Sequence, residues 1–188
     1  MFGIDDEEFI RGDGPMTKQE IRILTLAKAK IKPGDVVIDI GAGTGSLSIE
    51  AAQIARQVFA IERNHDTLEL IQQNADKFKI DNIIIINAEA PNGLDAIKNV
   101  DVALIGGSGG KLTKILETLN KRLKVGGRIV INCIAIQTIS EAINYFKSHD
   151  NYNYETIQVQ INRLQQVGHV DMSKALNPIY IVTALKSC

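Results

Sequence analysis

A glycine-rich segment near the start of the chain constrains its fold more than any other feature. The apolar run Val36–Ile40 is followed at once by Gly41, Gly43 and Gly45, and a helical pattern continues over Ser46–Ala55. Glycines let the chain turn sharply and let a ligand approach the backbone where a Cβ atom would otherwise stand. The pattern predicts a strand, a tight turn and a helix whose first N–H groups are free to face a ligand.

Beyond this segment, short apolar runs alternate with helical patterns, as in a parallel sheet covered by helices. Strands are predicted over 58–62, 83–86, 101–105 and 128–133, and helices over 65–78, 112–123 and 139–146. The runs 154–162 and 178–185 follow without a strong helical segment between them, which predicts an antiparallel pair that closes the sheet. We expect a Rossmann-like, doubly wound α/β sheet of seven mostly parallel strands with a terminal antiparallel hairpin. This variant is typical of methyltransferases.

The N-terminal region precedes the first strand. Thr17 and Glu20 form a T-x-x-E pattern, which predicts a capping box at the start of a helix over Thr17–Lys30, with Pro15 fixing the direction of the chain before it. The chain has 188 residues, which is the size of one domain. We therefore expect a single domain over 1–188, with 1–32 as an N-terminal helical extension.

Composition excludes several classes of partner. The net charge is −1 and no long basic run occurs, so a nucleic acid is not expected as a partner. No apolar stretch approaches the roughly 20 residues of a membrane span, and the acidic N-terminus lacks a signal-peptide core, which predicts a cytoplasmic protein. The two cysteines are far apart, and no metal-ligand spacing is present, so no metal is expected.

Two carboxylates indicate which ligand the glycine turn binds. Asp39 stands two positions before Gly41. A negative charge at this position does not favour a pyrophosphate, but it can pair with a ligand that has an ammonium group, such as S-adenosylmethionine. Glu62 ends the second predicted strand and can accept hydrogen bonds from both ribose hydroxyls. The alternative for Glu62 is a surface strand end with the neighbouring Arg63. After the third strand, Glu89 and Ala90 lie where this fold contacts adenine, unless they belong to a plain loop.

These positions make up the predicted cofactor site. Its residues are Asp39, Gly41, Ala42, Gly43, Thr44, Gly45, Glu62, Arg63, Glu89 and Ala90.

The acceptor is expected after the fourth strand, where glycines surround one serine before a predicted helix. Such a segment forms a backbone nest suited to carboxylates or another anion. Arg11, Lys18 and Arg163 are candidates for binding a polyanionic substrate, and Lys18 is also a candidate acid; simple solvation is the alternative for each. No catalytic residue is assigned, and the string Asn177–Tyr180 is interpreted as structural. The predicted nest and its neighbouring cation are Gly106, Gly107, Ser108, Gly109, Gly110 and Lys111.

Several segments together resemble a known family. The N-terminal segment Asp6–Ile10, the segment Pro15–Lys18, the glycine turn, the loop Gly106–Gly110 and the closing pair Asn177–Pro178 are similar to those of the decarboxylating cobalt-precorrin-6B C(15)-methyltransferases of cobalamin biosynthesis. The resemblance spans almost the whole chain. Its departures are Glu62 and Glu89, where relatives often have Asp, and both changes keep the carboxylate.

The resemblance implies methylation of carbon 15 of a polyanionic tetrapyrrole, with loss of carbon dioxide from the C-12 acetate to give cobalt-precorrin-7. It also implies that Thr17 contacts S-adenosylmethionine and that the protein is a homotetramer. From the residues alone, a protein-carboxylate or tRNA methyltransferase of the same fold stays open. Asp39 and the serine at position 46 argue against a nicotinamide-binding dehydrogenase, and the intact glycine turn argues against a non-catalytic corrinoid-binding module.

Overall fold

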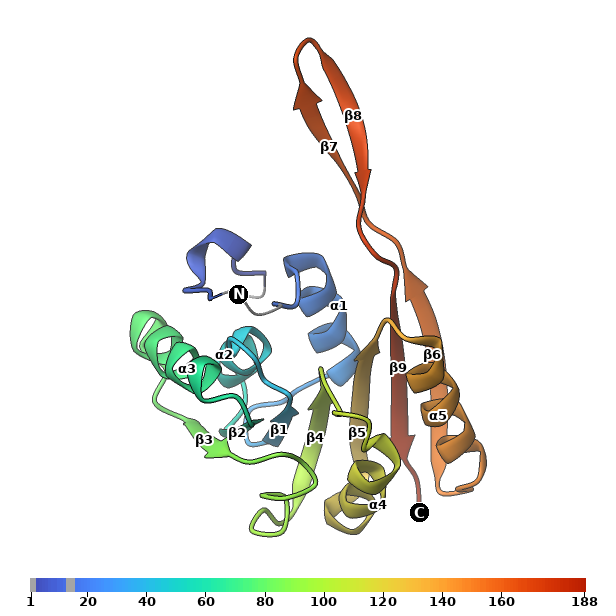
Figure 1. The fold of residues 1–188 in the computed structure, drawn as a ribbon. Coiled ribbons are helices and arrows are strands. Elements are labelled where there is room, and N and C mark those ends of the chain that lie inside the picture. The colour runs from blue at the N-terminus through green and yellow to red at the C-terminus, as the bar shows by residue number, and fades with distance from the viewer. Residues whose placement is uncertain (1–2, 13–15) are drawn as a thin grey trace.

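The protein folds into a seven-stranded sheet with helices on both faces and a separate hairpin (Figure 1). The structure is a computed structural model that describes residues 3–12 and 16–188, so the expectation for Pro15 lies outside the described residues. The strand order is β3-β2-β1-β4-β5-β9-β6. The strands of this sheet are β1 Val36–Ile40, β2 Gln57–Glu62, β3 Ile83–Asn87, β4 Val100–Ile105, β5 Leu123–Cys133, β6 Tyr152–Val159 and β9 Ile179–Lys186.

Strands β1 to β5 pair in parallel, whereas β9 runs antiparallel to both of its neighbours, β5 and β6. This arrangement confirms the predicted mostly parallel, doubly wound sheet and the antiparallel pair that closes it. The order reverses between β1 and β4, and such a switch point is where ligands bind in open α/β sheets.

Alternating side chains of β1 serve two cores. Ile38 and Ile40 pack in the cluster that contains α4 and α5, whereas Val37 packs with α1 and α2 on the other face. All five residues of β1 are buried, as expected of a central strand covered on both sides. The helices are α1 Gln19–Ala29, α2 Ser46–Ala52, α3 His65–Phe78, α4 Leu112–Arg122 and α5 Ile136–Lys147, preceded by a 3₁₀ turn, η1, over Asp6–Glu8.

The register of the sheet brings four strand ends into one row. Ile40 pairs with Ile61 on one side and with Ile105 on the other, and Ile105 pairs with Ile131. The residues that follow these four therefore meet at a single edge of the sheet, although up to 91 positions separate them in the sequence. The functional site is built along this edge.

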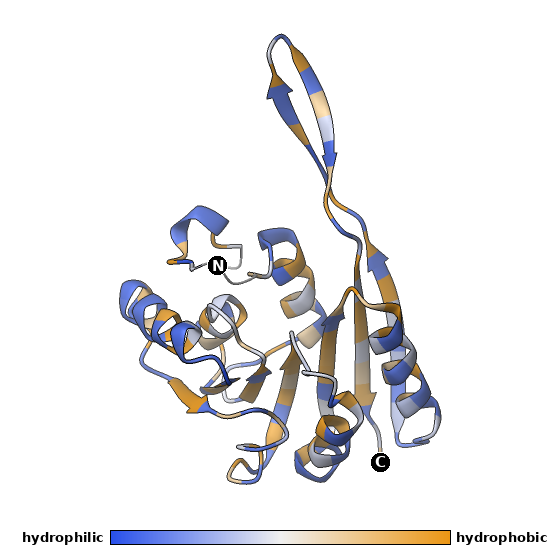
Figure 2. Ribbon diagram, viewed as in Figure 1, coloured by the Kyte–Doolittle hydropathy of each residue, from blue (hydrophilic) through white to orange (hydrophobic). Residues whose placement is uncertain are grey.

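A second, two-stranded sheet projects away from the body (Figure 1). It consists of β7 Asn162–Val167 and β8 Val170–Ala175, and all twelve residues are exposed. Polar and apolar residues are mixed along it, in contrast to the apolar central strands (Figure 2). The sequence did not predict this hairpin, whose tip is formed by Gly168 and His169 between the paired residues Val167 and Val170.

The start of the N-terminal helix differs from the prediction. Helix α1 begins at Gln19 with Lys18 as N-cap, and the side chain of Lys18 makes no capping hydrogen bond. The predicted capping box is therefore wrong. Instead, the carboxylate of Glu20 accepts hydrogen bonds from Arg163 of the hairpin at 2.8 and 2.9 Å.

The described part of the chain lacks two features that would indicate a membrane span or a metal site. None of its helices is both long and apolar enough to cross a membrane. Likewise, residues 3–12 and 16–188 contain no group of three or more His, Cys, Asp or Glu side chains that could hold a metal ion.

Candidate active site

One cavity of about 840 Å³ opens along the row of strand ends. Its floor is formed by the residues that follow β1, β2, β4 and β5, and its sides by the segment before α1, the loop between β5 and α5, and the chain that leads from the hairpin into β9. A volume of this size lies within the range of small-molecule sites.

The glycine turn requires glycine because another turn packs directly against it. A Cβ atom on Gly41 would lie 2.7 Å from the nitrogen and 2.8 Å from the oxygen of Gly107, closer than real Cβ atoms approach backbone. Gly41 also has φ +70°, a conformation that L side chains rarely adopt. The N–H of Gly106 donates to the carbonyl of Ile40 at 2.9 Å, so the two turns form one unit.

Asp39 is a buried carboxylate beside the turn. It is 1% exposed, and its Oδ2 accepts a hydrogen bond from Ser48 Oγ of α2 at 2.6 Å. Its Oδ1 is buried without a hydrogen-bond partner in the described residues. Burial raises the pKa of Asp39 to about 6, with the negative charge of Glu62 adding to the rise and the Ser48 hydrogen bond opposing it. A buried carboxylate oxygen without a partner is costly, and it is a strong acceptor for a cationic ligand in the cavity.

Glu62 reaches the glycine turn as the sequence predicted. Its Oε2 accepts from the N–H of Gly43 at 3.0 Å, and its Oε1 accepts from the N–H groups of Arg63 and Asn64 at 2.8 and 2.9 Å. Three backbone donors therefore fix the carboxylate at the cavity wall. Since two carboxylate oxygens have about four acceptor sites, at least one remains for a ligand.

Glu89 joins three loops at the mouth of the cavity. Its Oε1 accepts from Arg63 Nη1 at 2.6 Å and its Oε2 from Lys111 Nζ at 2.5 Å. These hydrogen bonds lower the pKa of Glu89, that of Lys111 having the larger effect. Lys111, predicted as a substrate contact, is thus engaged with a residue that was predicted to contact the cofactor.

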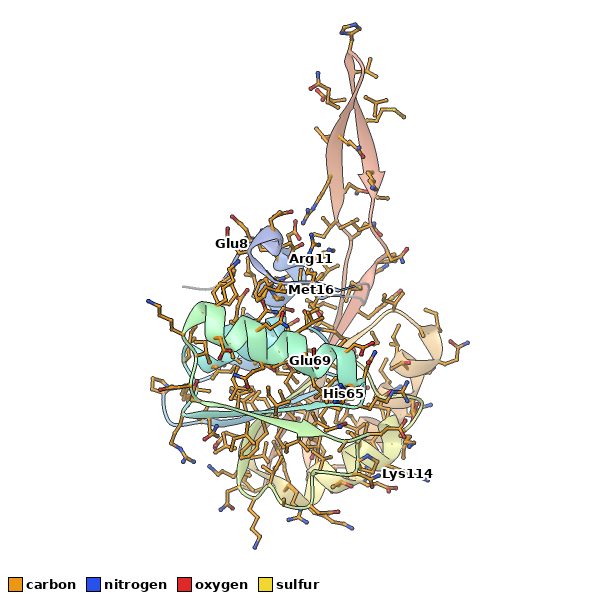
Figure 3. All side chains as sticks on the ribbon, turned by 60° about the vertical axis from the view of Figure 1, so that its left-hand side comes forward. Glu8, Arg11, Met16, His65, Glu69 and Lys114 are labelled. Atoms are coloured by element: carbon orange, nitrogen blue, oxygen red, sulfur yellow. The ribbon has the colours of Figure 1, made fainter. Side chains whose placement is uncertain are left out.

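Most of the predicted site residues converge on the cavity. Gly45, Gly110 and Lys111 do not line it, although Gly45 is the N-cap of α2. Arg11 and Arg163 lie away from it as well, and Figure 3 shows Arg11 beside Glu8 at the N-terminal side of the molecule. The predicted residues that do line the cavity are Thr17, Lys18, Asp39, Gly41, Ala42, Gly43, Thr44, Glu62, Arg63, Glu89, Ala90, Gly106, Gly107, Ser108 and Gly109.

The sequence reasoning missed the side of the cavity formed by β5 and β9. Asn132 lines it directly after the row of strand ends, and its amide is in contact with Thr25 Oγ1 at 3.0 Å. Ile134 and Leu176 add apolar surface, and Asn177, interpreted as structural, lines the cavity too. The signal that could have found Asn132 is its place as a polar residue one position before the end of an apolar strand.

Cys133 also lines this side, and burial raises the pKa of its thiol to about 11. It is therefore a neutral thiol at physiological pH rather than a nucleophile.

The fold and the site together define a class of protein. A seven-stranded sheet with a reversed strand β9 and a glycine turn after β1, followed by an acidic residue at the end of β2, is the architecture of the class I methyltransferases. The family model described as "Precorrin methyltransferase domain" matches residues 8–186. The chain belongs to this family.

Individual relatives agree with the family. The chain is 42% identical to a Sulfurisphaera tokodaii protein named "Probable cobalt-precorrin-6B C(15)-methyltransferase (decarboxylating)", over 96% of this chain and 95% of that protein. A crystal structure of precorrin-6y C5,15-methyltransferase from Geobacter metallireducens has a TM-score of 0.92 and 38% identity, covering 98% of both chains. The crystal structure of precorrin 8w decarboxylase from Methanobacterium thermoautotrophicum has a TM-score of 0.91 and 31% identity, covering 96% of this chain and 98% of that one.

Proposed function

We propose that this protein uses S-adenosylmethionine to methylate carbon 15 of cobalt-precorrin-6B and removes carbon dioxide from the C-12 acetate, giving cobalt-precorrin-7. The observation that carries the proposal is the cavity, which joins a buried carboxylate and a glycine turn at one end to an apolar surface at the other. Relatives that share 38–42% of their residues with nearly the whole chain have the name of this reaction. We propose that residues 1–188 act as one domain, with 1–32 as its N-terminal extension.

The residues at the glycine turn fit S-adenosylmethionine. The unpartnered Oδ1 of Asp39 offers an acceptor to the ammonium of the methionine part, and the remaining acceptor site of Glu62 suits a ribose hydroxyl. Gly43 lines the cavity and has no side chain that would stand between its backbone and the cofactor. Thr17, Arg63, Glu89 and Ala90 line the same cavity and would complete this end of it.

The described site holds few acid–base groups, and the proposed chemistry needs few. S-adenosylmethionine, when bound, supplies an electrophilic methyl group, and the electron-rich macrocycle supplies the carbon nucleophile. The protein's part is to align the two and to exclude water from the sulfonium. Ile134 and Leu176 give the macrocycle an apolar surface, and Cys133, as a neutral thiol, does not compete for the methyl group.

The turn over Gly106–Gly109 lies between the two ends of the cavity, where its backbone can position the acceptor. We propose that this turn, together with Gly110, Lys111 and Lys18, contacts the carboxylates of the tetrapyrrole. Of these cations, Lys18 lines the cavity directly, and its Nζ lies 3.7 Å from Asp6 Oδ2. Arg11 and Arg163 lie farther out and would act on the approach of the polyanion rather than in the bound complex.

The hairpin supports a homotetramer. Val167, Val170 and Met172 lie on one face of it by strand alternation, and they are 50%, 61% and 54% exposed. A two-stranded hairpin is marginally stable alone, and clustered exposed apolar side chains mark interaction sites. We propose that copies of this chain assemble through the hairpin and that the enzyme works in the cytoplasm. Sedimentation equilibrium of the wild type tests the assembly, and a monomer would contradict it.

A methyl-transfer assay tests the function. The protein is incubated with methyl-labelled S-adenosylmethionine and, in separate reactions, with cobalt-precorrin-6B or bulk tRNA. We expect label in the tetrapyrrole and none in the tRNA. Label in tRNA alone, with binding that weakens steeply as salt rises, would replace the proposal with an RNA methyltransferase.

A further inference from the structure

A buried cluster of charges lies outside the residues assigned to the site. The side chain of Arg22 in α1 is 0% exposed, as is that of Glu50 in α2, and that of Asp6 is 5% exposed. Arg22 Nε donates to Glu50 Oε1 at 2.8 Å, and Nη1 donates to Asp6 Oδ1 at 2.7 Å. We call these three residues the Arg22 cluster. It joins the N-terminal segment, residues 3–12, to the helices α1 and α2.

The cluster also holds backbone next to the cavity. Arg22 Nη1 donates to the carbonyl of Thr17 at 2.6 Å, and Nη2 donates to the carbonyl of Ile4. Asp6 Oδ1 accepts from the N–H of Gln19 at 3.0 Å. Thr17 lines the cavity between Met16 and Lys18, and we call residues 16–18 the lip. One guanidinium therefore fixes the lip against α2, the helix that begins directly after the glycine turn.

A second buried residue connects the N-terminal segment to the glycine turn. Asn74 of α3 is 0% exposed, and its Nδ2 donates to the carbonyls of Ile10 and Thr44 at 3.0 and 2.9 Å. Its Oδ1 accepts from the N–H of Ile10 at 2.8 Å. The N-terminal segment is thus anchored near both of its ends to elements that carry the glycine turn. Figure 1 shows this segment lying over α2 and α3.

The arrangement of the Arg22 cluster indicates that it fixes the positions of backbone groups rather than adding to the stability of the fold. Buried ion pairs are weak evidence for stability, because desolvation offsets the attraction and apolar residues often do as well. What an arginine supplies is a planar fork of five donors with fixed directions, and Arg22 uses it to reach four acceptors on three segments. A lysine has the same charge but cannot hold these acceptors in one plane.

We propose that Arg22 is a positioning residue for the cofactor site: it fixes the backbone of Thr17 so that the lip closes one side of the cavity over S-adenosylmethionine. The inference rests on the proposed function only in naming that ligand. Arg22 does not line the cavity, so its effect on the site passes through the lip. Loss of the fork is expected to weaken cofactor binding more than it weakens the fold.

Calorimetric titration with S-adenosylmethionine tests this on the full chain. Arg22→Lys keeps the charge, and the matched control is Leu119→Ala in α4, which damages the core cluster on the face of the sheet opposite α1. At a temperature where both variants are folded by thermal melting, we expect Arg22→Lys to bind at least tenfold more weakly than wild type and Leu119→Ala to bind within twofold of it. Equal affinities in wild type and Arg22→Lys overturn the proposal, and so does an equal loss in both variants.

Hydrogen exchange separates this proposal from the proposed function. Amides of residues 16–19 should exchange at least tenfold faster in Arg22→Lys than in wild type, with α4 unchanged; unchanged exchange at 16–19 overturns the positioning role. This readout needs no ligand, so a wild type that binds no S-adenosylmethionine refutes the function alone. If Arg22→Lys does not fold, Asp6→Ala removes one arm of the cluster outside the sheet and decides the question by the same two measurements.

Discussion

Binding of S-adenosylmethionine should depend on pH through Asp39. Burial raises the pKa of this carboxyl to about 6 in the free protein. Only the carboxylate form can pair with an ammonium, so affinity should rise as the pH rises through about 6 and level off near 7. For one group with this pKa, the dissociation constant at pH 5 is about tenfold larger than at pH 7. Titration calorimetry at constant ionic strength over this range measures the change.

Asp39→Asn isolates the residue. The amide keeps the shape and can still accept from Ser48, but it has no charge. A hydrogen bond to a charged group contributes about 1.5–3 kcal/mol, so binding at pH 7 should weaken by roughly 10- to 150-fold and become independent of pH. A wild-type dissociation constant that is equal at pH 5 and 7, or a tenfold change that persists in Asp39→Asn, would refute the reasoning.

The same carboxyl should make the free protein less stable as pH rises. A folded-state pKa raised from 3.8 to about 6 means that stability is fully present below the lower value and is lost as pH rises through the higher one. The shift corresponds to about 3 kcal/mol at neutral pH. Asp39→Asn should therefore unfold at higher urea concentration than wild type at pH 7, but not at pH 4. Equal urea midpoints at pH 7 would contradict the burial cost.

Three further predictions test other parts of the account. Gly41→Ala should lose about 2–5 kcal/mol of stability, because strain at positive φ adds to a clash with Gly107. The control Gly126→Ala has a similar φ of +81° but open space around it, and it should lose about 1 kcal/mol. Equal losses of the two variants in urea denaturation would contradict the close approach of Gly41 and Gly107. Glu62→Ala should weaken S-adenosylmethionine binding by roughly 1–3 kcal/mol in calorimetry. Met172→Asp should dissociate the proposed homotetramer in sedimentation, and an unchanged mass would exclude the hairpin as the interface.

The strands of the sheet could be predicted because the residues that specify each strand are neighbours in the sequence. The run Val36–Ile40 is apolar at every position but one, and glycines end it, so strand and turn follow from neighbouring residues. The same holds for Glu62, whose distance from Gly41 suits one helix and one strand. Both predictions place residues at strand ends, and the parallel register then brings these ends together at one edge of the sheet.

The N-terminal region could not be predicted in the same way. The T-x-x-E pattern is local, but the contacts that decide the helix start are not, since Glu20 pairs with Arg163, 143 positions away. Arg22 stands on the apolar stripe of α1 with Leu26 and Ala29, which is a visible signal of a buried charge. Its partners, 16 and 28 positions away, were beyond any local pattern.

The hairpin was missed for a different reason. Strands are found from sequence by the alternation that burial imposes, and β7 and β8 are exposed throughout. With no buried face, the alternation around Gly168 was weak. The unpredicted side of the cavity, at Asn132, depended on which strand lies beside β4, and that is a property of the sheet rather than of any segment.

Mass spectrometry of a single-turnover reaction tests the central claim most directly. The wild-type protein is incubated with cobalt-precorrin-6B and S-adenosylmethionine carrying a deuterated methyl group, and the tetrapyrrole is extracted and weighed. The account predicts one product that has gained a labelled methyl group and lost carbon dioxide. A tetrapyrrole recovered with its mass unchanged, from protein that binds S-adenosylmethionine, would contradict the account.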